Sequence, residues 1–266
     1  MAAEHEQWAL ILGASSGFGE ATARTLAKRG FNICGVHLDR RAGMKHVDAL
    51  TAAIRDTGRQ ALFFNVNAAD HEKRQQVIDA LAGRIAEDGG GVVRVLMHSL
   101  AFGSLTPFVG AEAARLATPA QIEMTMNVMA NSLVYWVQGA AGRGLLTRGS
   151  RVVAMTSAGS SRVWPGYGPV SAAKAALESY VRQLAVELGP SGVTVNAIRA
   201  GVTDTPAFRK IPGSELLASE VRSRNPSGRM TEPSDVAEVI AMLAGTEAQW
   251  ITGTVIGVDG GEDVAT

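Results

Sequence analysis

Short apolar runs alternate with longer amphipathic segments along the whole chain. Runs of strand length occupy residues 8–12, 31–37, 61–66, 92–97, 151–156, 193–198 and 254–258. The segments between most of them have helical length, and strands separated by helices imply right-handed βαβ units. The pattern predicts an α/β fold: a single-domain, Rossmann-like, doubly wound parallel sheet flanked by helices, spanning residues 1–266.

Two of the intervening segments carry clear helix signals. Residues 18–29 end at Gly30, a suitable left-handed C-cap, and residues 171–188 end at Gly189-Pro190. Apolar residues recur every three or four positions in the second segment, so Tyr180 on that stripe is interpreted as core. Residues 205–229 show no long periodic pattern. We expect a substrate-binding lid within 204–230, and an ordinary surface connection is the alternative.

Composition removes several classes of function. The chain has 266 residues, 46% of them hydrophobic and 19% charged, which is typical of a globular protein. The 25 basic residues equal the 25 acidic ones, so charge gives no reason to expect nucleic acid or membrane as a partner. The single Cys34 lies in an apolar run and predicts an inert core thiol and a cytoplasmic protein. The scattered histidines predict no metal site.

A glycine-rich segment follows the first apolar run. It reads Gly13-Ala-Ser15-Ser16-Gly17-Phe18-Gly19 and precedes a helix-like segment. Glycines allow a tight turn and a close approach to a pyrophosphate, whose charge a helix N-terminus favours. The context predicts a dinucleotide site here, with Ser15 and Ser16 as further hydroxyl donors.

The end of the second run bears on which nicotinamide dinucleotide is used. An acidic residue there would accept from a ribose diol, but this chain has His37, with Asp39, Arg40 and Arg41 after it. Arg40 or Arg41 could meet a 2′-phosphate, which favours NADP (NADPH) over NAD (NADH). A solvated turn is the other interpretation of these arginines.

Tyr167 stands seven positions before Lys174. An ammonium close to a phenol lowers the phenol's proton affinity, which makes Tyr167 a candidate acid. Pro169 suits the first turn of a helix and disfavours helical geometry at Gly168, so we expect Tyr167 just ahead of the helix. A surface tyrosine and a solvated lysine are the alternative, and the upstream glycine motif argues against it.

These motifs together resemble the short-chain dehydrogenase/reductase family, and within it the enoyl-acyl-carrier-protein reductases, including their NADPH-using bacterial branch. Ordinary members have tyrosine four before the lysine, where this chain has Val170; Tyr167 is similar to the enoyl reductases' position. His98-Ser99-Leu100-Ala101 resembles their His-Ser motif, and Ala200-Gly201 resembles their replacement of Pro-Gly. The ordinary catalytic asparagine should fall near Met129, between Asn127 and Asn131.

The resemblance implies roles for individual residues. Lys174 would hold the nicotinamide ribose and lower the pKa of the Tyr167 phenol. Ser157 occupies the ordinary family's catalytic serine position, and a plain strand-end hydroxyl is its alternative. The remaining cofactor contacts implied are Asn65 and Val66 at the adenine, and Ser99, Leu100, Ala101, Gly201, Val202 and Thr205 toward the nicotinamide and diphosphate.

The displaced tyrosine favours reduction of a conjugated double bond. Seven helical residues rise about 10 Å against about 6 Å for four, so the donor can reach a thioester oxygen several bonds from the carbon that receives hydride. We therefore expect an enoyl-acyl-carrier-protein reductase-like enzyme of fatty acid biosynthesis. Its substrate would be an acyl thioester of acyl-carrier protein or coenzyme A, and family resemblance implies a homotetramer or dimer. A ketone or 3-ketoacyl reductase, which Ser157 favours, and a non-enzymatic dinucleotide sensor are the alternatives.

Overall fold

Parallel strands form the centre of the molecule in the computed structural model, which describes residues 6–112, 115–211 and 213–265. The strands are β1 (Glu6–Leu12), β2 (Asn32–His37), β3 (Ala61–Asn65), β4 (Gly91–His98), β5 (Arg151–Thr156), β6 (Thr194–Ala200) and β7 (Val255–Val258). Within the described residues they make one seven-stranded sheet in the order β3-β2-β1-β4-β5-β6-β7. Every pairing is parallel, as the alternation of apolar runs predicts.

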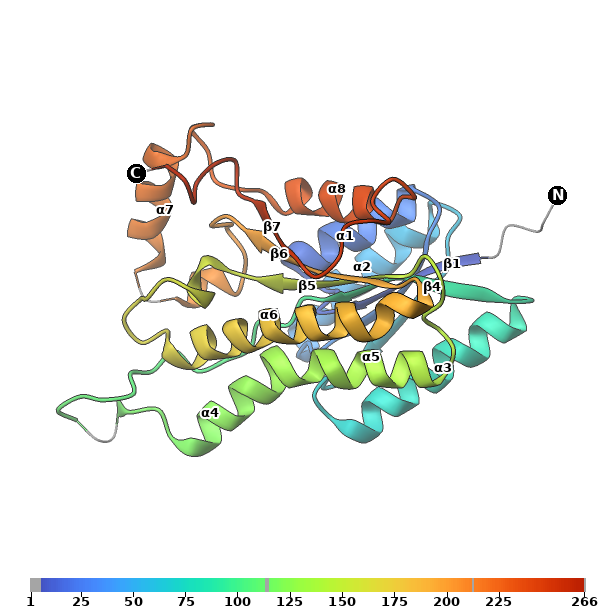
Figure 1. Ribbon diagram of the computed structural model, residues 1–266, viewed down its shortest axis with the longest axis horizontal. Coiled ribbons are helices and arrows are strands. Elements are labelled where there is room, and N and C mark those ends of the chain that lie inside the picture. The colour runs from blue at the N-terminus through green and yellow to red at the C-terminus, as the bar shows by residue number, and fades with distance from the viewer. Residues whose placement is uncertain (1–5, 113–114, 212, 266) are drawn as a thin grey trace.

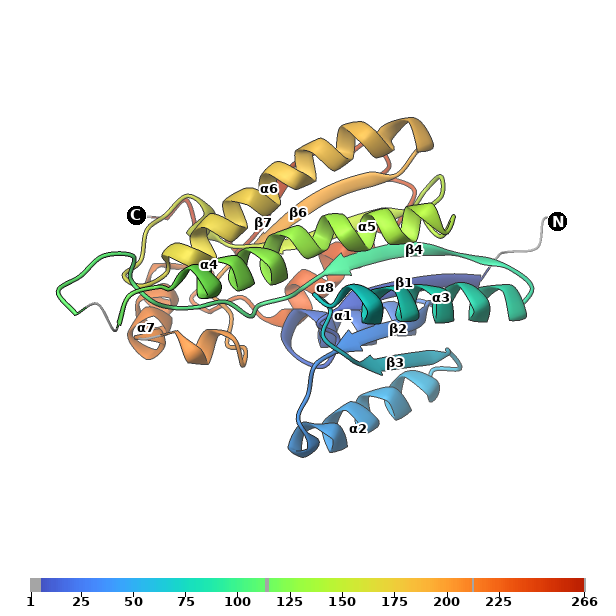
Figure 2. The ribbon, with the colours of Figure 1, turned by 90° about the horizontal axis from the view of Figure 1, so that it is seen from below.

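Helices cover both faces of this sheet (Figures 1 and 2). The helices are α1 (Gly17–Lys28), α2 (Met44–Arg55), α3 (His71–Glu87), α4 (Pro119–Met126), α5 (Ser132–Gly142), α6 (Gly168–Leu188), α7 (Ser214–Arg224) and α8 (Pro233–Leu243). One apolar core joins the sheet to α3, α5 and α6, and a second joins it to α1, α2 and α8. The predicted doubly wound, Rossmann-like sheet is confirmed.

Most predicted boundaries differ from the observed ones by one or two residues. β5 matches its prediction at both ends, and every one of its residues is buried. β1 begins two residues early because Glu6 and Gln7 continue the pairing with β4 although their side chains are polar. α6 begins at Gly168 with Pro169 in its first turn, so Tyr167 lies just ahead of the helix as expected.

The segment without a predicted helix contains α7, which the sequence pattern missed. Val221 is the one residue of α7 that is buried, so no apolar stripe marks this helix. Both views place α7 near the end of the chain, away from the helices that cover the sheet (Figures 1 and 2).

The strand order creates a crevice at the carboxyl edge of the sheet. β1 pairs with β2 on one side and with β4 on the other, so the chain winds outward from β1 in both directions. Loops that follow β1 and β4 therefore diverge to opposite faces and leave a space between them. The predicted site residues follow these strand ends. Of the helices in the described residues, none has the length and apolar character needed to cross a bilayer.

Candidate active site

The glycine turn between β1 and α1 is fixed by backbone crowding. A Cβ at Gly13 would lie 2.4 Å from the carbonyl oxygen of Ser99, at the end of β4. A Cβ at Gly19 would lie 2.0 Å from the carbonyl oxygen of Gly13, because α1 begins directly against the turn. Gly17 has φ +54° and faces the Thr205 methyl group. This narrow backbone cradle, which opens on the N-terminus of α1, fits the diphosphate of a dinucleotide.

A cleft of about 320 Å³ continues from this turn along the ends of β4, β5 and β6. Ten predicted site residues line it: Phe18, Ser99, Leu100, Ala101, Ser157, Tyr167, Lys174, Gly201, Val202 and Thr205. The others follow β1, β2 and β3 outside this cleft: Gly13, Ser15, Ser16, Gly17, Gly19, His37, Arg40, Asn65 and Val66. Such a division suits a ligand with two ends, and a dinucleotide is one.

Tyr167 is the residue just before α6, and its ring packs against the core. Its ring meets Trp164 edge to face, with centroids 6.0 Å apart. Burial raises the pKa of the phenol, and the neighbouring Ser157 hydroxyl lowers it. The phenol is therefore neutral at physiological pH and is available as a hydrogen-bond donor.

Ser157 follows β5 and faces the same space. Its Oγ is buried, and among the described residues it forms no hydrogen bond of ordinary length and angle. A Cβ at Gly159 would lie 2.4 Å from the Tyr167 ring and 3.2 Å from Ser157 Oγ, which brings the two groups together at this glycine. A buried hydroxyl without a partner is costly, so Ser157 is suited to bind a polar ligand atom.

Lys174 lines one side of the cleft and is 5% exposed. Its Nζ donates to the carbonyl oxygen of Met155 at 2.7 Å. Burial lowers the pKa of Lys174 to about 8, while the Glu178 carboxylate acts in the opposite direction. The lowering of the Tyr167 pKa by Lys174 stays a prediction; in this structure burial raises that pKa most, and the Lys174 ammonium donates to Met155.

His98 has a structural role. Its Nε2 lies 2.8 Å from Ser132 Oγ, and that hydroxyl gives its only proton to the carbonyl oxygen of Val128 at 2.7 Å. His98 Nε2 is therefore the donor. Burial and then the charge of Lys174 lower the pKa of His98 to about 3, so the imidazole is neutral.

The slot of the ordinary family's asparagine lies in one turn of π-helix, Asn127–Asn131. Met129 points its buried side chain into the cleft from this turn. The two asparagines lie outside the cleft, and Asn131 Oδ1 accepts from the Tyr180 hydroxyl at 2.9 Å. Tyr180 is thus a packing residue with a satisfied hydroxyl, as its position on the apolar stripe suggests.

The ends of β2 and β3 are tied together by Asp39. Asn65 uses both ends of its amide on the backbone of Asp39, at 3.0 and 2.9 Å. The buried His37 ring contacts the Asp39 carboxylate at 2.9 Å. Arg40 is exposed. An acidic and a basic residue thus lie side by side where the ribose of the adenosine would bind.

A buried carboxyl that the sequence did not indicate completes the cleft. Glu262 follows β7 and is 7% exposed, and its Oε2 accepts from the backbone N–H of Val202 at 2.9 Å. Burial raises the pKa of Glu262 most, while the Val202 N–H and the charge of Arg224 lower it. Only the three-dimensional path of the chain after Gly260-Gly261 brings this residue to the site.

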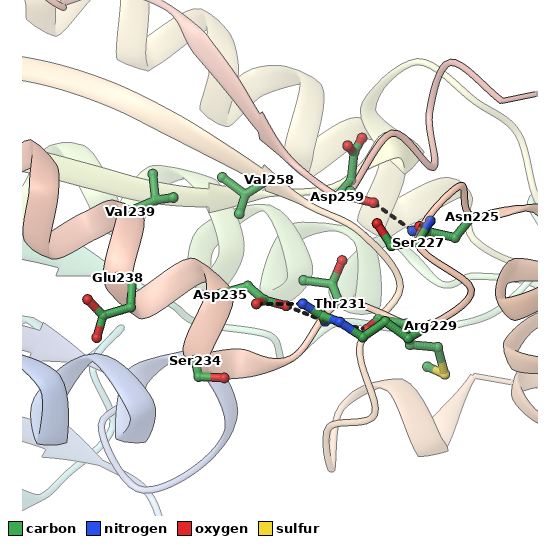
Figure 3. A pocket seen from close by; sticks show the side chains of 12 residues that line it. Asn225, Ser227, Arg229, Thr231, Ser234, Asp235, Glu238, Val239, Val258 and Asp259 are labelled. Carbon is green, nitrogen blue, oxygen red and sulfur yellow. Dashed lines mark hydrogen bonds and ion pairs between the residues drawn. The ribbon is translucent and has the colours of Figure 1, made fainter.

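A second cavity of about 420 Å³ lies between the N-terminus of α8 and the turn after β7 (Figure 3). In this cavity Arg229 forms a bidentate ion pair with Asp235. Asn225 donates to the carbonyl oxygen of Asp259. None of the predicted site residues lines this cavity. The described residues contain no group of His, Cys, Asp and Glu suited to a metal ion.

A doubly wound sheet, a glycine turn at its switch point and a Tyr–Lys pair in the adjoining cleft together define a dinucleotide-dependent oxidoreductase. A family model described as "Enoyl-(Acyl carrier protein) reductase" matches residues 13–262. The chain belongs to the short-chain dehydrogenase/reductase family, as the sequence motifs predict.

Individual relatives have varied substrates. The cis-4-hydroxycyclohexanecarboxylate dehydrogenase of Sinomonas cyclohexanicum is 30% identical over 256 residues, covering 96% of each chain. The 1-cyclohexenylcarbonyl-CoA reductase of Streptomyces collinus is 30% identical over 268 residues, covering 97% of this chain and 88% of the relative.

Solved structures agree on the fold. A short chain dehydrogenase from Burkholderia cenocepacia J2315 in complex with NADP has a TM-score of 0.81 at 28% identity, covering 97% of this chain and 98% of that one. The enoyl-[acyl-carrier-protein] reductase (NADH) of Aquifex aeolicus has a TM-score of 0.82 at 24% identity, with 98% and 97% covered.

Proposed function

We propose that the protein is an NAD(P)H-dependent reductase of the carbon–carbon double bond in a trans-2-enoyl thioester. The observation that carries this proposal is the position of the phenol. Tyr167 enters the cleft from just ahead of α6, and the slot four residues before Lys174 holds the buried, apolar Val170. A donor displaced in this way suits an oxygen several bonds from the carbon that is reduced.

The residues divide the work of this reaction. A nicotinamide dinucleotide held by the glycine turn and Lys174 would supply a hydride for the β-carbon, and the electron pair of the double bond would move toward the thioester oxygen. Tyr167 donates a hydrogen bond to that oxygen and supplies the proton that completes the reduction. Lys174, anchored on the Met155 carbonyl, presents its remaining protons to the cofactor ribose. Leu100, Met129 and Trp164 give the cleft an apolar lining that excludes water from the reacting carbons.

The segment 204–230 is proposed as the substrate lid. Thr205, Phe208, Ile211 and Leu217 from its described residues line the cleft. α7 has one buried residue, so few contacts hold it in one position. An acyl group of varied shape can therefore be covered by adjusting this segment.

The relatives support a conjugated thioester but not a particular acyl group. The name 1-cyclohexenylcarbonyl-CoA describes a ring double bond conjugated with a thioester carbonyl, the same arrangement as a trans-2-enoyl group. The other relative is named for a cyclohexane carboxylate. We therefore extend the proposal from straight-chain fatty acyl groups to cyclic ones, with acyl-carrier protein or coenzyme A as carrier.

Reduction of a ketone or 3-ketoacyl thioester is the second candidate. Ser157 favours it, because its buried hydroxyl has no ordinary hydrogen bond in the described residues and lies beside the Tyr167 phenol. A serine and a tyrosine together can bind the oxygen of a ketone directly at the carbon that receives hydride.

One assay separates the candidates. Oxidation of NADPH and of NADH is followed with crotonyl-CoA and with acetoacetyl-CoA, at equal enzyme concentration. We expect turnover of crotonyl-CoA, and faster turnover with NADPH because the exposed Arg40 is available to a 2′-phosphate. Turnover of acetoacetyl-CoA alone would replace the first candidate by the second. Binding of cofactor without turnover of any thioester, cyclohexenylcarbonyl-CoA included, would instead favour a sensor.

A further inference from the structure

Glu262 is a buried carboxyl that the proposed chemistry does not use. It lines the same cleft as Tyr167 and Lys174, and it is 7% exposed. Burying a carboxylate is unfavourable unless hydrogen bonds or opposite charges compensate. Its Oε2 accepts from Val202 N, whereas its Oε1 has no hydrogen bond within the described part of the chain. One oxygen therefore remains to accept from a ligand.

The turn that carries Glu262 is fixed on both sides. The carbonyl oxygen of Asp259 accepts from the Glu262 N–H at 3.1 Å and from Asn225 Nδ2 at 2.8 Å, the second contact being drawn in Figure 3. Beyond it, Asp263 pairs with Arg162 at 2.7 Å and with Arg199 at 2.9 Å. The carboxyl is thus positioned by its neighbours.

Gly201 makes room for this carboxylate. A Cβ at that position would lie 2.7 Å from Glu262 Oε2 and 2.4 Å from Thr231 Oγ1. Any larger residue would push the carboxylate away from Val202. The glycine of the Ala200-Gly201 pair therefore serves the carboxylate as well as the backbone turn.

The contact with Val202 changes what a nicotinamide would meet. Family resemblance places Val202 at the nicotinamide amide, and here the Val202 N–H donates to Glu262. The cleft therefore offers a carboxyl acceptor beside that position. A carboxamide has an NH₂ group as well as a carbonyl oxygen, so it can present hydrogens to such an acceptor.

We propose that Glu262 is a cofactor-binding residue whose carboxylate accepts a hydrogen bond from the nicotinamide carboxamide and favours the oxidised, positively charged ring. The inference rests on the proposed function, because it requires a nicotinamide dinucleotide in this cleft. A negative charge in a water-poor cleft stabilises a nearby cation and leaves a neutral ring almost unaffected. Glu262 thus makes the reduced cofactor a better hydride donor by stabilising the form that it becomes.

The test compares affinities for the two redox forms, with no turnover involved. Dissociation constants of NADP⁺ and NADPH are measured by calorimetric titration for the wild type, Glu262→Gln, Glu262→Asp and Glu187→Gln. Glu262→Gln is expected to weaken binding of NADP⁺ about tenfold more than binding of NADPH. Glu187→Gln removes an exposed carboxylate of α6 that accepts from Gln183 and does not line the cleft, and it should keep the wild-type ratio.

The outcomes separate this inference from the proposed function. A wild type that binds neither NADP(H) nor NAD(H) would overturn both. Binding by the wild type with an unchanged ratio in Glu262→Gln would overturn only the role of Glu262. Glu262→Asp keeps the charge, so its ratio should lie nearer the wild type; a ratio equal to that of Glu262→Gln would assign Glu262 to packing and also overturn the inference.

Discussion

The two ends of the candidate site, the glycine turn and the adjoining cleft, are built on different principles. At the glycine turn, backbone atoms define the shape: a Cβ at Gly13 or Gly19 would lie 2.4 or 2.0 Å from a carbonyl oxygen. At the other end, side chains of loops and of α7 define the shape, and α7 has only Val221 buried. The first end tolerates no added atom, whereas the second can change its side chains without disturbing the sheet.

This difference accounts for one fold serving different substrates. The proposed diphosphate cradle follows from the fold, because β1, β4 and α1 approach closely there. The proposed acyl end depends on individual side chains of a segment with few buried residues. The relatives named above agree with this division, since one is named for a hydroxycyclohexanecarboxylate and the other for a cyclohexenylcarbonyl thioester.

Replacing the proposed proton donor should give the largest effect, and it should leave the cofactor end untouched. Tyr167→Phe removes one hydroxyl from the cleft, and we expect kcat with crotonyl-CoA to fall about a thousandfold. The dissociation constant of NADPH should change less than threefold, measured by fluorescence titration. Tyr180→Phe, on the same helix but with its hydroxyl on Asn131, is the control and should keep nearly full turnover. Equal activity of the two variants would remove Tyr167 from the mechanism.

A single methyl group should disrupt the cofactor end. Gly19→Ala places a Cβ 2.0 Å from the Gly13 carbonyl oxygen, so the turn must move. We expect NADPH affinity to fall about a hundredfold and the free energy of unfolding to fall by about 1–3 kcal/mol.

Gly83→Ala is the matched control for Gly19→Ala. Gly83 lies in α3 with nothing within 4 Å of its added Cβ. The substitution should therefore raise the free energy of unfolding by about 0.5–1 kcal/mol, as measured by urea denaturation. Retention of NADPH binding by Gly19→Ala would show that the turn is not the cradle.

The same contrast explains how far the sequence could predict the molecule. The apolar run predicts both ends of β5 correctly, because all of the side chains of this strand are buried. Apolar runs hide α7, which packs through one residue, and they cannot reveal Glu262, whose place depends on a turn held by Asn225 and Asp259. The sequence spacing predicted that Tyr167 and Lys174 act together, and both line one cleft. It could not predict that the Lys174 ammonium donates to the Met155 carbonyl oxygen. Partners distant along the chain leave no local pattern.

Adjacent leucines of α7 can test the substrate end. Leu217 lines the cleft, whereas Leu216 is 79% exposed and does not. Leu217→Ala should raise the KM for an acyl thioester about tenfold through lost apolar contact, with no change in NADPH affinity. Leu216→Ala should leave KM unchanged. An equal rise in both variants would mean that α7 acts through helix stability and not through contact with the acyl group.

The smallest effect should come from a charge at the boundary between the two ends. Glu178 accepts from the Thr156 hydroxyl at 2.6 Å, and its charge raises the pKa of Lys174 against the larger, lowering effect of burial. Because that pKa is about 8, Lys174 loses its proton as pH rises through this value, and its proposed contact with the cofactor ribose should weaken with it. The raised pKa of Tyr167 keeps that phenol neutral over the same range.

Glu178→Gln removes the charge that supports the Lys174 proton, so the basic limb of the kcat/KM profile should move to lower pH. We expect a loss of about twofold near pH 8 and none near pH 6, where the lysine stays protonated in both proteins. Glu187→Gln changes a carboxylate on the same helix that pairs with Gln183 outside the cleft, and it should leave the profile in place. A uniform loss at all pH values in Glu178→Gln would instead indicate that the Thr156 hydrogen bond, and not the charge, is what the enzyme needs from Glu178.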